Sequence, residues 1–534
     1  MLVLQLQGRG GMACLQRRRP GTQGQGGRHD EGQEQGCGVT AAGGHGDSPG
    51  KEWVLALEGA PGGRFARLAR RGAGLTIPGM DNPFLTRAEM LFFQARHADA
   101  LRTARMGLAL FPDDAGLLEI AGHCAAVLDE VDAAEACWAR LAALCPDAAE
   151  PRNERAILLG RLGRVEEAEA EYRAAIERAP GWASAHSNLG TLLADLARDG
   201  EAEACFRHAL ALDPDSAVAA KNLGQLLLAL GRFDEGWALH ESRLRETPPV
   251  SVPAGAPCRF WQGEPLAGKS VLVLPEQGLG DEIQFSRYLP WLKAQGAARV
   301  TLVCRGAQKA LFAGLAGVDR LLGLEDEADG LLEAHDYWTV LLSLPFRAAT
   351  RADSIPAQVP YLHPDPQRQA ALAPRLAGAG RKVGLVWQGN PAHSNDRDRS
   401  LPDLSILAPL WAVPGLRFFS LQVPAPAQAL PGNLPLTDLA PHLHDFADTA
   451  ALLAGLDLLI SVDTSCAHLA GALGVPCWLL LPAWRSDWRW LRERGDSPWY
   501  PRTRLFRQPR RGEWGAVVAD LGRALAEWAA GPSA

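Results

Sequence analysis

Residues 150–183 read EPRNERAILLGRLGRVEEAEAEYRAAIERAPGWA, and this stretch is one period of a repeat. Prolines return every 34 residues (146 − 112, for example), at Pro112, Pro146, Pro180, Pro214 and Pro248. Small residues keep the same register at Gly122, Ala156, Gly190 and Gly224, and aromatic residues keep it at Trp138, Tyr172 and Phe206. Small residues let two helices approach, an aromatic ring fills the space between them, and proline ends the second helix because it lacks an amide N–H. The pattern predicts stacked helix pairs over 82–115, 116–149, 150–183, 184–217 and 218–250.

The 34-residue period resembles the tetratricopeptide repeat. That resemblance implies a curved α-solenoid over residues 82–250, whose concave face binds an extended peptide or another protein. An unrelated helical bundle with coincidental spacing is the alternative, and five prolines in one register argue against it.

After a predicted linker at 248–253, the hydrophobic pattern of the sequence changes to short apolar strands that alternate with helices. The first half, 258–375, has expected strands at 270–274, 299–304 and 339–342. The second half, 381–530, has expected strands at 382–387, 417–421, 458–462 and 477–481, with a helix at 449–456. We expect two Rossmann-like α/β halves with parallel sheets, whose ligands bind outside the carboxyl ends of the strands. A last helix, 516–528, is expected to pack back onto the first half.

Composition narrows the class of protein. Of the first 50 residues, 14 are glycine, so we expect residues 1–79 to be a disordered leader, and we hypothesise that translation starts at Met80. A net charge of −7 argues against a dedicated nucleic-acid binder. The sequence contains no apolar run of about 18 residues, so no membrane-spanning helix is predicted. Ten cysteines without a CxxC pair favour a reducing, cytoplasmic location.

One candidate site lies at residues 459–476, where a strand should end at Asp463 and a helix should begin at about Thr464. Free amides and the helix dipole at such a turn attract anions. Thr464 and Ser465 add hydroxyl donors, and His468 lies one turn further along. An ordinary turn with Asp463 or Thr464 as the N-cap is the alternative.

A second candidate lies at Gly278-Leu279-Gly280-Asp281, at another turn from strand to helix. The glycines at 278 and 280 would let the backbone approach a ligand, and Asp281 would sit at the mouth of the cleft. In the alternative, Asp281 only caps the helix that runs to Tyr288.

A third candidate is the polar loop 388–400, which follows the first strand of the second half. The planar guanidinium of Arg397 or Arg399 suits phosphate oxygens. Asp396-Arg397-Asp398 could hold a divalent metal, but the arginines already compensate the carboxylates, so no metal site is expected. A solvated loop of paired charges is the alternative.

Together these motifs make residues 261–530 resemble the bacterial heptosyltransferase-type glycosyltransferases of the GT-B fold. The resemblance implies that Asp281 is the general base, that the run from Asp463 to Ala472 binds the donor, and that Arg399 replaces a phosphate-binding lysine. Repeats joined to such a module are also similar to protein O-GlcNAc transferases and to bacterial tetratricopeptide-repeat glycosyltransferases. Ser465 stands where heptosyltransferases have glycine, so heptose is not inferred as the sugar.

The tryptophans of the segment 484–490 border the predicted cleft. Trp484 and Trp488 could stack on a sugar or a base, or they could form core packing and an interdomain lid. The two resemblances together imply an inverting, metal-independent glycosyltransferase that uses a nucleotide-sugar donor and needs no cofactor. They also imply that the repeats recruit a protein acceptor or partner. A non-catalytic adaptor with a degenerate glycosyltransferase-like module is the alternative.

Overall fold

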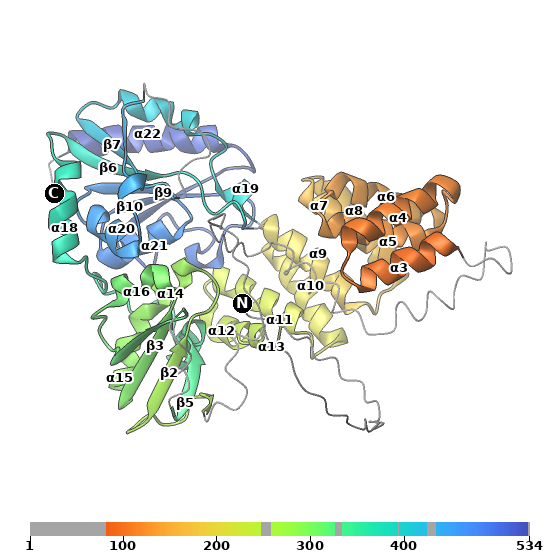
Figure 1. Cartoon of the computed structure of the whole chain (residues 1–534), viewed down its shortest axis with the longest axis horizontal. Helices are drawn as coiled ribbons and strands as arrows, with labels where there is room; N and C mark the ends of the chain where they lie inside the picture. Colours follow the sequence, from red (N-terminus) through yellow and green to blue (C-terminus); the bar gives the residue numbers. More distant parts are fainter. Residues whose placement is uncertain (1–81, 247–257, 326–333, 394, 424–433, 532–534) are drawn as a thin grey trace, which may run out of the picture. The chain divides into compact units, whose positions relative to one another are not determined.

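The computed structural model describes residues 82–246, 258–325, 334–393, 395–423 and 434–531. The predicted leader 1–79 and the predicted linker 248–253 lie outside the described residues. The described chain consists of helical repeats followed by two parallel sheets with helices on their faces (Figure 1).

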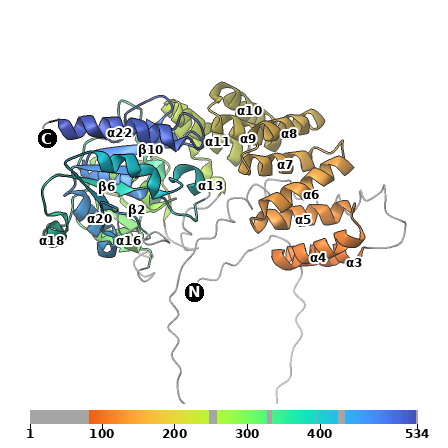
Figure 2. The same ribbon diagram turned by 90° about the horizontal axis from the view of Figure 1, so that it is seen from above.

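Within residues 82–246, helix pairs follow one another at the predicted period (Figure 2). They are α3 (Pro83–Phe93) with α4 (His97–Leu110), α5 (Ala115–Val127) with α6 (Val131–Leu144), α7 (Glu150–Arg161) with α8 (Val165–Arg178), α9 (Ala183–Asp195) with α10 (Asp199–Leu212), and α11 (Ala217–Ala229) with α12 (Phe233–His240). The short helix α13 (Arg243–Glu246) ends this part. Pro112, Pro146, Pro180 and Pro214 each lie two residues beyond the end of a second helix, as the repeat pattern predicts.

The small and aromatic positions of the repeat meet inside each pair. A Cβ atom added at Gly122 would lie 2.7 Å from the Trp138 ring, and one added at Gly190 would lie 2.8 Å from the Phe206 ring. At Gly224 the same atom would meet backbone, at 2.7 Å from the amide nitrogen of His240. The small and aromatic residues that recur every 34 positions are therefore the ones at which the two helices of a pair contact each other.

The first α/β half has a five-stranded parallel sheet of order β1-β5-β2-β3-β4. Its strands are β1 (Arg259–Phe260), β2 (Ser270–Leu274), β3 (Arg299–Cys304), β4 (Arg320–Gly323) and β5 (Tyr337–Val340). The strand expected at 339–342 begins two residues earlier, and Leu341–Ser343 forms a 3-10 turn. Helix α14 (Leu279–Phe285) follows β2, and α16 (Gly306–Phe312) follows β3.

The second half has a six-stranded parallel sheet of order β11-β10-β9-β6-β7-β8. Its strands are β6 (Arg381–Val386), β7 (Leu416–Ser420), β8 (Leu436–Asp438), β9 (Leu458–Val462), β10 (Cys477–Leu481) and β11 (Thr503–Arg507). The helices used below are α18 (Pro366–Leu372), α19 (Asp396–Arg399), α20 (Phe446–Leu453), α21 (Ser465–Leu473) and α22 (Trp514–Ala530).

Two helices differ from the expected arrangement. Helix α22 was predicted to pack on the first half, and this prediction is wrong. Its residues Trp514, Val517 and Leu521 lie in the apolar core of the second half. Helix α18 lies inside the range assigned to the first half, yet it packs on α20, and Arg368 pairs with Asp445. Both helices therefore belong to the second half.

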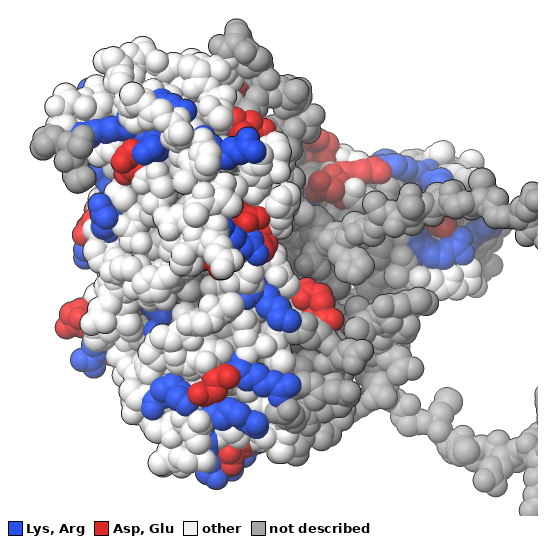
Figure 3. All heavy atoms as spheres, turned by 60° about the vertical axis from the view of Figure 1, so that its left-hand side comes forward, with Lys and Arg blue, Asp and Glu red and all other residues white. Residues whose placement is uncertain are grey.

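Charged side chains of both signs are interspersed over both halves on the face drawn in Figure 3. Among the described residues, no helix combines the length and the apolar character that crossing a bilayer requires.

Candidate functional site

The two halves meet where α14 of the first half packs against α21 of the second. Gly280 lies at this contact: a Cβ atom there would lie 2.7 Å from Cδ2 of His468 and 3.5 Å from Cα of Ser465. Only a residue without a side chain lets the two turns approach this closely. The predicted glycine turn and the predicted anion-binding turn are therefore in direct contact.

Asp281 faces this contact from the first half. Its Oδ2 accepts a hydrogen bond from the backbone N–H of Gly278 at 2.7 Å, and its Oδ1 pairs with the guanidinium of Arg489 from the second half. The capping role that the sequence left open is thus present, together with a charge pair across the two halves. Burial raises the pKa of Asp281 above its ordinary value, while Arg489 acts in the opposite direction.

Arg489 is the centre of the charge cluster and is only 4% exposed. Its Nη1 lies 3.0 Å from both carboxylate oxygens of Asp487, and its Nε donates to Oε1 of Gln284 at 2.8 Å. Its guanidinium lies over the ring of Trp488, 4.3 Å from the centroid. Sequence reasoning missed this residue; its only signal was an arginine within the tryptophan-rich segment 484–490.

Asp463 and His468 occupy the second half's side of the contact. Asp463 accepts a hydrogen bond from the indole N–H of Trp490 at 2.9 Å, and its Oδ1 lies 3.9 Å from Nε2 of His468. Burial, reinforced by the negative charge of Asp487, raises the pKa of Asp463 to about 6. Burial lowers the pKa of His468 to about 3, so its imidazole is neutral at pH 7.

The His468 ring is fixed on two sides. Its Nδ1 lies 3.0 Å from the hydroxyl of Tyr500, and its plane stacks on Trp490 with centroids 5.2 Å apart. Tyr500 and Trp490 were not among the predicted site residues.

Thr464 occupies the N-cap position of α21, but its side chain makes no capping bond. Its hydroxyl instead lies 3.0 Å from the hydroxyl of Ser461. The amides of Ala467 and His468 both donate to the carbonyl of Thr464, at 3.0 and 3.3 Å. The amides of Ser465 and Cys466 begin the helix and have no acceptor within it, so these two are the candidates for binding an anion.

Arg399 lies on α19, where its Nε is 3.3 Å from Oδ1 of Asp396. Its positive charge also lowers the pKa of Asp463, so the predicted phosphate ligand acts on the same cluster. Gly389 leaves room for the guanidinium of Arg399, since a Cβ atom at residue 389 would lie 2.6 Å from Nη2 of Arg399.

The two tryptophans proposed as stacking surfaces are buried by protein. Trp484 is 4% exposed and belongs to an apolar cluster with Tyr172 and Leu193 of the repeats. Trp488 is 6% exposed and packs edge-to-face on Trp237, with centroids 5.3 Å apart. These contacts favour the packing interpretation that the sequence left open.

Comparison with known proteins identifies the helical part. A model of the tetratricopeptide repeat family matches residues 149–181 and 183–216. Protein FlbA of Caulobacter vibrioides is 29% identical over 323 residues, which is 55% of this chain and 52% of FlbA. The chain therefore spans about half the length of this curated relative.

Solved structures are similar to about a third of this chain. TTC0263, a thermophilic tetratricopeptide repeat protein of Thermus thermophilus, is 26% identical over 31% of this chain and 91% of its own, with a TM-score of 0.28. PilW, a type IV pilus biogenesis factor, is 24% identical over 31% and 77%, with a TM-score of 0.29. The family model places tetratricopeptide repeats within residues 149–216, and the repeats are followed by two parallel α/β halves.

Proposed function

We propose that this protein is an inverting, metal-independent glycosyltransferase of the GT-B type, which moves a sugar from a nucleotide-sugar donor to an acceptor hydroxyl. One observation carries the proposal. The Asp281 carboxylate of the first half meets Arg489 of the second half, at the contact between the two predicted motif turns.

The chemistry assigns one task to each side. The acceptor oxygen forms a bond to the anomeric carbon, and the bond from that carbon to the diphosphate oxygen breaks. Asp281 takes the acceptor's proton, and the electron pair of the broken bond leaves with the diphosphate. A raised pKa suits this role, because it makes the carboxylate a better proton acceptor.

Positive groups of the second half would stabilise the departing diphosphate. Arg399, Arg489 and the first amides of α21 supply hydrogen-bond donors, which lower the barrier because negative charge grows there in the transition state. Arg489 would exchange its bond to Asp281 for phosphate oxygens, and this exchange would free the base. Donor entry requires α14 and α21 to separate, because Gly280 and His468 are in contact.

The repeats would recruit the acceptor protein or a partner protein through their concave face. Mass spectrometry of candidate partners, incubated with a panel of nucleotide sugars, tests this directly. Addition of one hexose-sized or similar mass to the partner supports the proposal, and no added mass with any donor contradicts it.

The base assignment has its own test. Asp281→Asn should lower kcat by about 100-fold or more while nucleotide diphosphate affinity stays nearly unchanged, because only proton transfer is lost. The exposed variant Asp520→Asn is the control. A rate for Asp281→Asn within a few fold of the unmodified protein would show that Asp281 is not the base.

A non-catalytic adaptor is the second candidate, and the same ion pair favours it. Asp281 is already bonded by Gly278 and Arg489, which is how a structural carboxylate is held. Thermal shift with UDP, GDP, ADP, CDP and TDP separates the two functions. At 100-fold excess over Kd, a bound diphosphate should stabilise the fold by about 2.7 kcal/mol, whereas the adaptor should respond to none of the five.

A further inference from the structure

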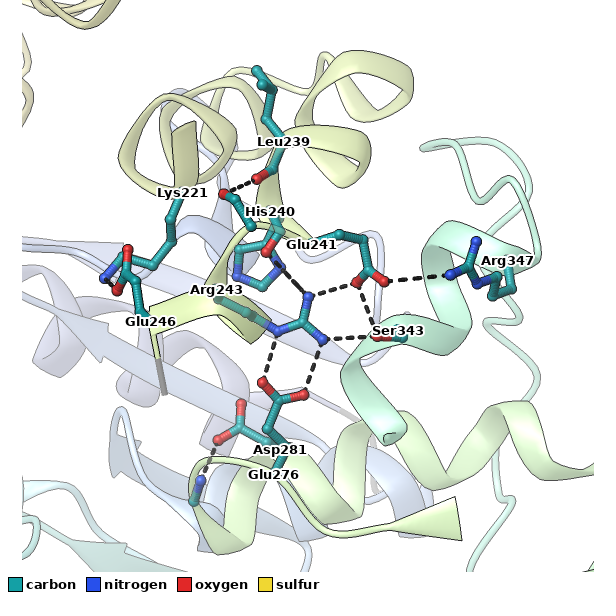
Figure 4. Close-up of polar contacts among 12 residues, drawn as sticks. Lys221, Leu239, His240, Glu241, Arg243, Glu246, Glu276, Asp281, Ser343 and Arg347 are labelled. Atoms are coloured by element: carbon teal, nitrogen blue, oxygen red, sulfur yellow. Dashed lines mark hydrogen bonds and ion pairs between the residues drawn. The ribbon is translucent and has the colours of Figure 1, made fainter. Parts of the chain in front are cut away.

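The last repeat is joined to the Asp281 turn by a buried arginine. Arg243, on α13, is 5% exposed and pairs with Glu276, the second residue after β2. Its Nε donates to Oε1 of Glu276 at 2.7 Å, and its Nη2 donates to Oε2 at 2.9 Å. Figure 4 shows Arg243 facing Glu276, with Asp281 close by on the same turn.

All five N–H groups of this guanidinium are used. Besides Glu276, Nη1 donates to the carbonyl of His240 at 3.1 Å and to Oε1 of Glu241 at 2.6 Å, and Nη2 donates to the hydroxyl of Ser343 at 3.0 Å. Ser343 in turn donates to Glu241 at 2.9 Å. The network therefore ties the end of the repeats to two separate loops of the first half (Figure 4).

The partner of Asp281 is anchored to the repeats as well. On one side of Arg489, Arg485 donates to Oδ2 of Asp195 at 3.0 Å. On the other side, Arg492 lies 3.0 Å from Oδ1 of Asp199 and donates to the carbonyl of Ala194 at 2.9 Å. These contacts hold the segment around Arg489 against α9 and α10.

We propose that the last repeats are part of the site, and that Arg243 is a positioning residue that fixes the turn from Glu276 to Asp281 against Arg489. Its effect on turnover rests on the proposed function; its effect on the turn does not. The alternative is a purely structural contact between the repeats and the first half, which would stabilise the whole fold without a selective effect on this turn. The Arg243 network favours the selective effect because its bidentate partner, Glu276, lies only five residues before Asp281.

Hydrogen exchange of the full chain tests the positioning directly. Arg243→Lys keeps the charge but loses the bidentate fork. Amides 279–283 should then exchange about tenfold faster, the effect of losing one charge-assisted hydrogen bond. Amides of β3, in the same half, should exchange at an unchanged rate. The matched control is Arg232→Lys, an exposed repeat arginine that pairs with Glu203 and Glu235.

Two exchange results would overturn the proposal. Unchanged exchange at 279–283 would show that Arg243 does not hold the turn. An equal rise in β3 would show a general staple. If Arg243→Lys does not fold, Ser343→Ala replaces it, because this variant removes one hydrogen-bond acceptor of Arg243. Amides 279–283 should again exchange faster in Ser343→Ala, and an unchanged exchange rate would overturn the proposal.

Steady-state kinetics provides a second test, with whichever nucleotide-sugar donor supports sugar transfer by the unmodified protein. Arg243→Lys should lower kcat about tenfold with little change in KM for the donor, since the base is displaced but the phosphate ligands are not. An unchanged kcat would overturn the positioning role. Absence of transfer by the unmodified protein would contradict the proposed function alone, because the exchange result stands without it.

Discussion

At the scale of residues, the site is a cluster in which buried charges of both signs compensate one another. Arg489 has Asp281 and Asp487 as direct partners, and Asp463 and His468 lie beside them. Removing either partner of such a pair leaves an unpaired buried charge, so single substitutions here should destabilise the protein strongly.

Asp463 and His468 should give opposite pH dependences of stability. The raised pKa of Asp463, about 6, means that the folded state holds its proton more tightly than the unfolded state. Its contribution to the free energy of unfolding is present below pH 4 and is lost as pH rises to 6. The lowered pKa of His468, about 3, has the reverse effect: its contribution is lost as pH falls from 6.5 toward 3.

Chemical denaturation of the unmodified protein, Asp463→Asn and His468→Asn between pH 4 and 6 measures both effects. The stability advantage of the unmodified protein over Asp463→Asn should shrink by about 2 kcal/mol as pH rises. Its advantage over His468→Asn should grow over the same range. Parallel curves for all three proteins would refute both assignments.

Arg399 should bind the donor diphosphate. Arg399→Ala removes a charge-assisted hydrogen bond, so the affinity for the nucleoside diphosphate found by thermal shift should fall about 10- to 100-fold. Arg397→Ala is the matched control, because Arg397 lies on the same short helix. Calorimetric titration measures both, and equal affinities for the two variants would remove Arg399 from the site.

At the scale of elements, sequence patterns located most of the secondary structure. The strands expected at 270–274, 299–304, 458–462 and 477–481 coincide with β2, β3, β9 and β10, since each is a short apolar run buried on both faces. The short strands β1, β4, β8 and β11 were not expected. They are two to five residues long and border the sheets, where half-exposed positions weaken the apolar signal.

Gly190 should be needed for the packing of its helix pair. A Cβ atom there would lie 2.8 Å from the Phe206 ring, so Gly190→Ala should lower the free energy of unfolding by about 1–3 kcal/mol. The matched control is Gly200→Ala on the partner helix, where nothing lies within 4 Å and alanine should stabilise by up to about 1 kcal/mol. Urea denaturation compares them, and equal stability of the two variants would contradict this packing.

At the scale of the whole described chain, the repeats and the α/β halves share one core. Trp237 of the last repeat is 2% exposed and packs on Trp488 of the second half. Its indole N–H donates to the carbonyl of Thr350 in the first half at 3.0 Å. One side chain therefore joins the repeats to both halves.

Trp237→Ala should lower the free energy of unfolding by about 3–5 kcal/mol, because a large buried ring is lost. Trp237→Phe keeps an aromatic ring and loses the hydrogen bond, so its cost should be smaller, about 1–3 kcal/mol. Denaturant unfolding orders the three proteins. A Trp237→Ala variant within about 1 kcal/mol of the unmodified protein would show that the shared core contributes little.

The sequence by itself determined the repeat and its helix pairs, the central strands, and the motif turns at 278–281 and 463–468. These features are local: period, apolar runs and turn residues act within one or two elements. The tertiary structure decided which side chains meet. Arg243 reaches Glu276 across 33 residues (276 − 243), Arg489 reaches Asp281 across 208 (489 − 281), and Trp237 reaches Trp488 across 251 (488 − 237). No periodicity in the sequence predicts a contact between elements so far apart.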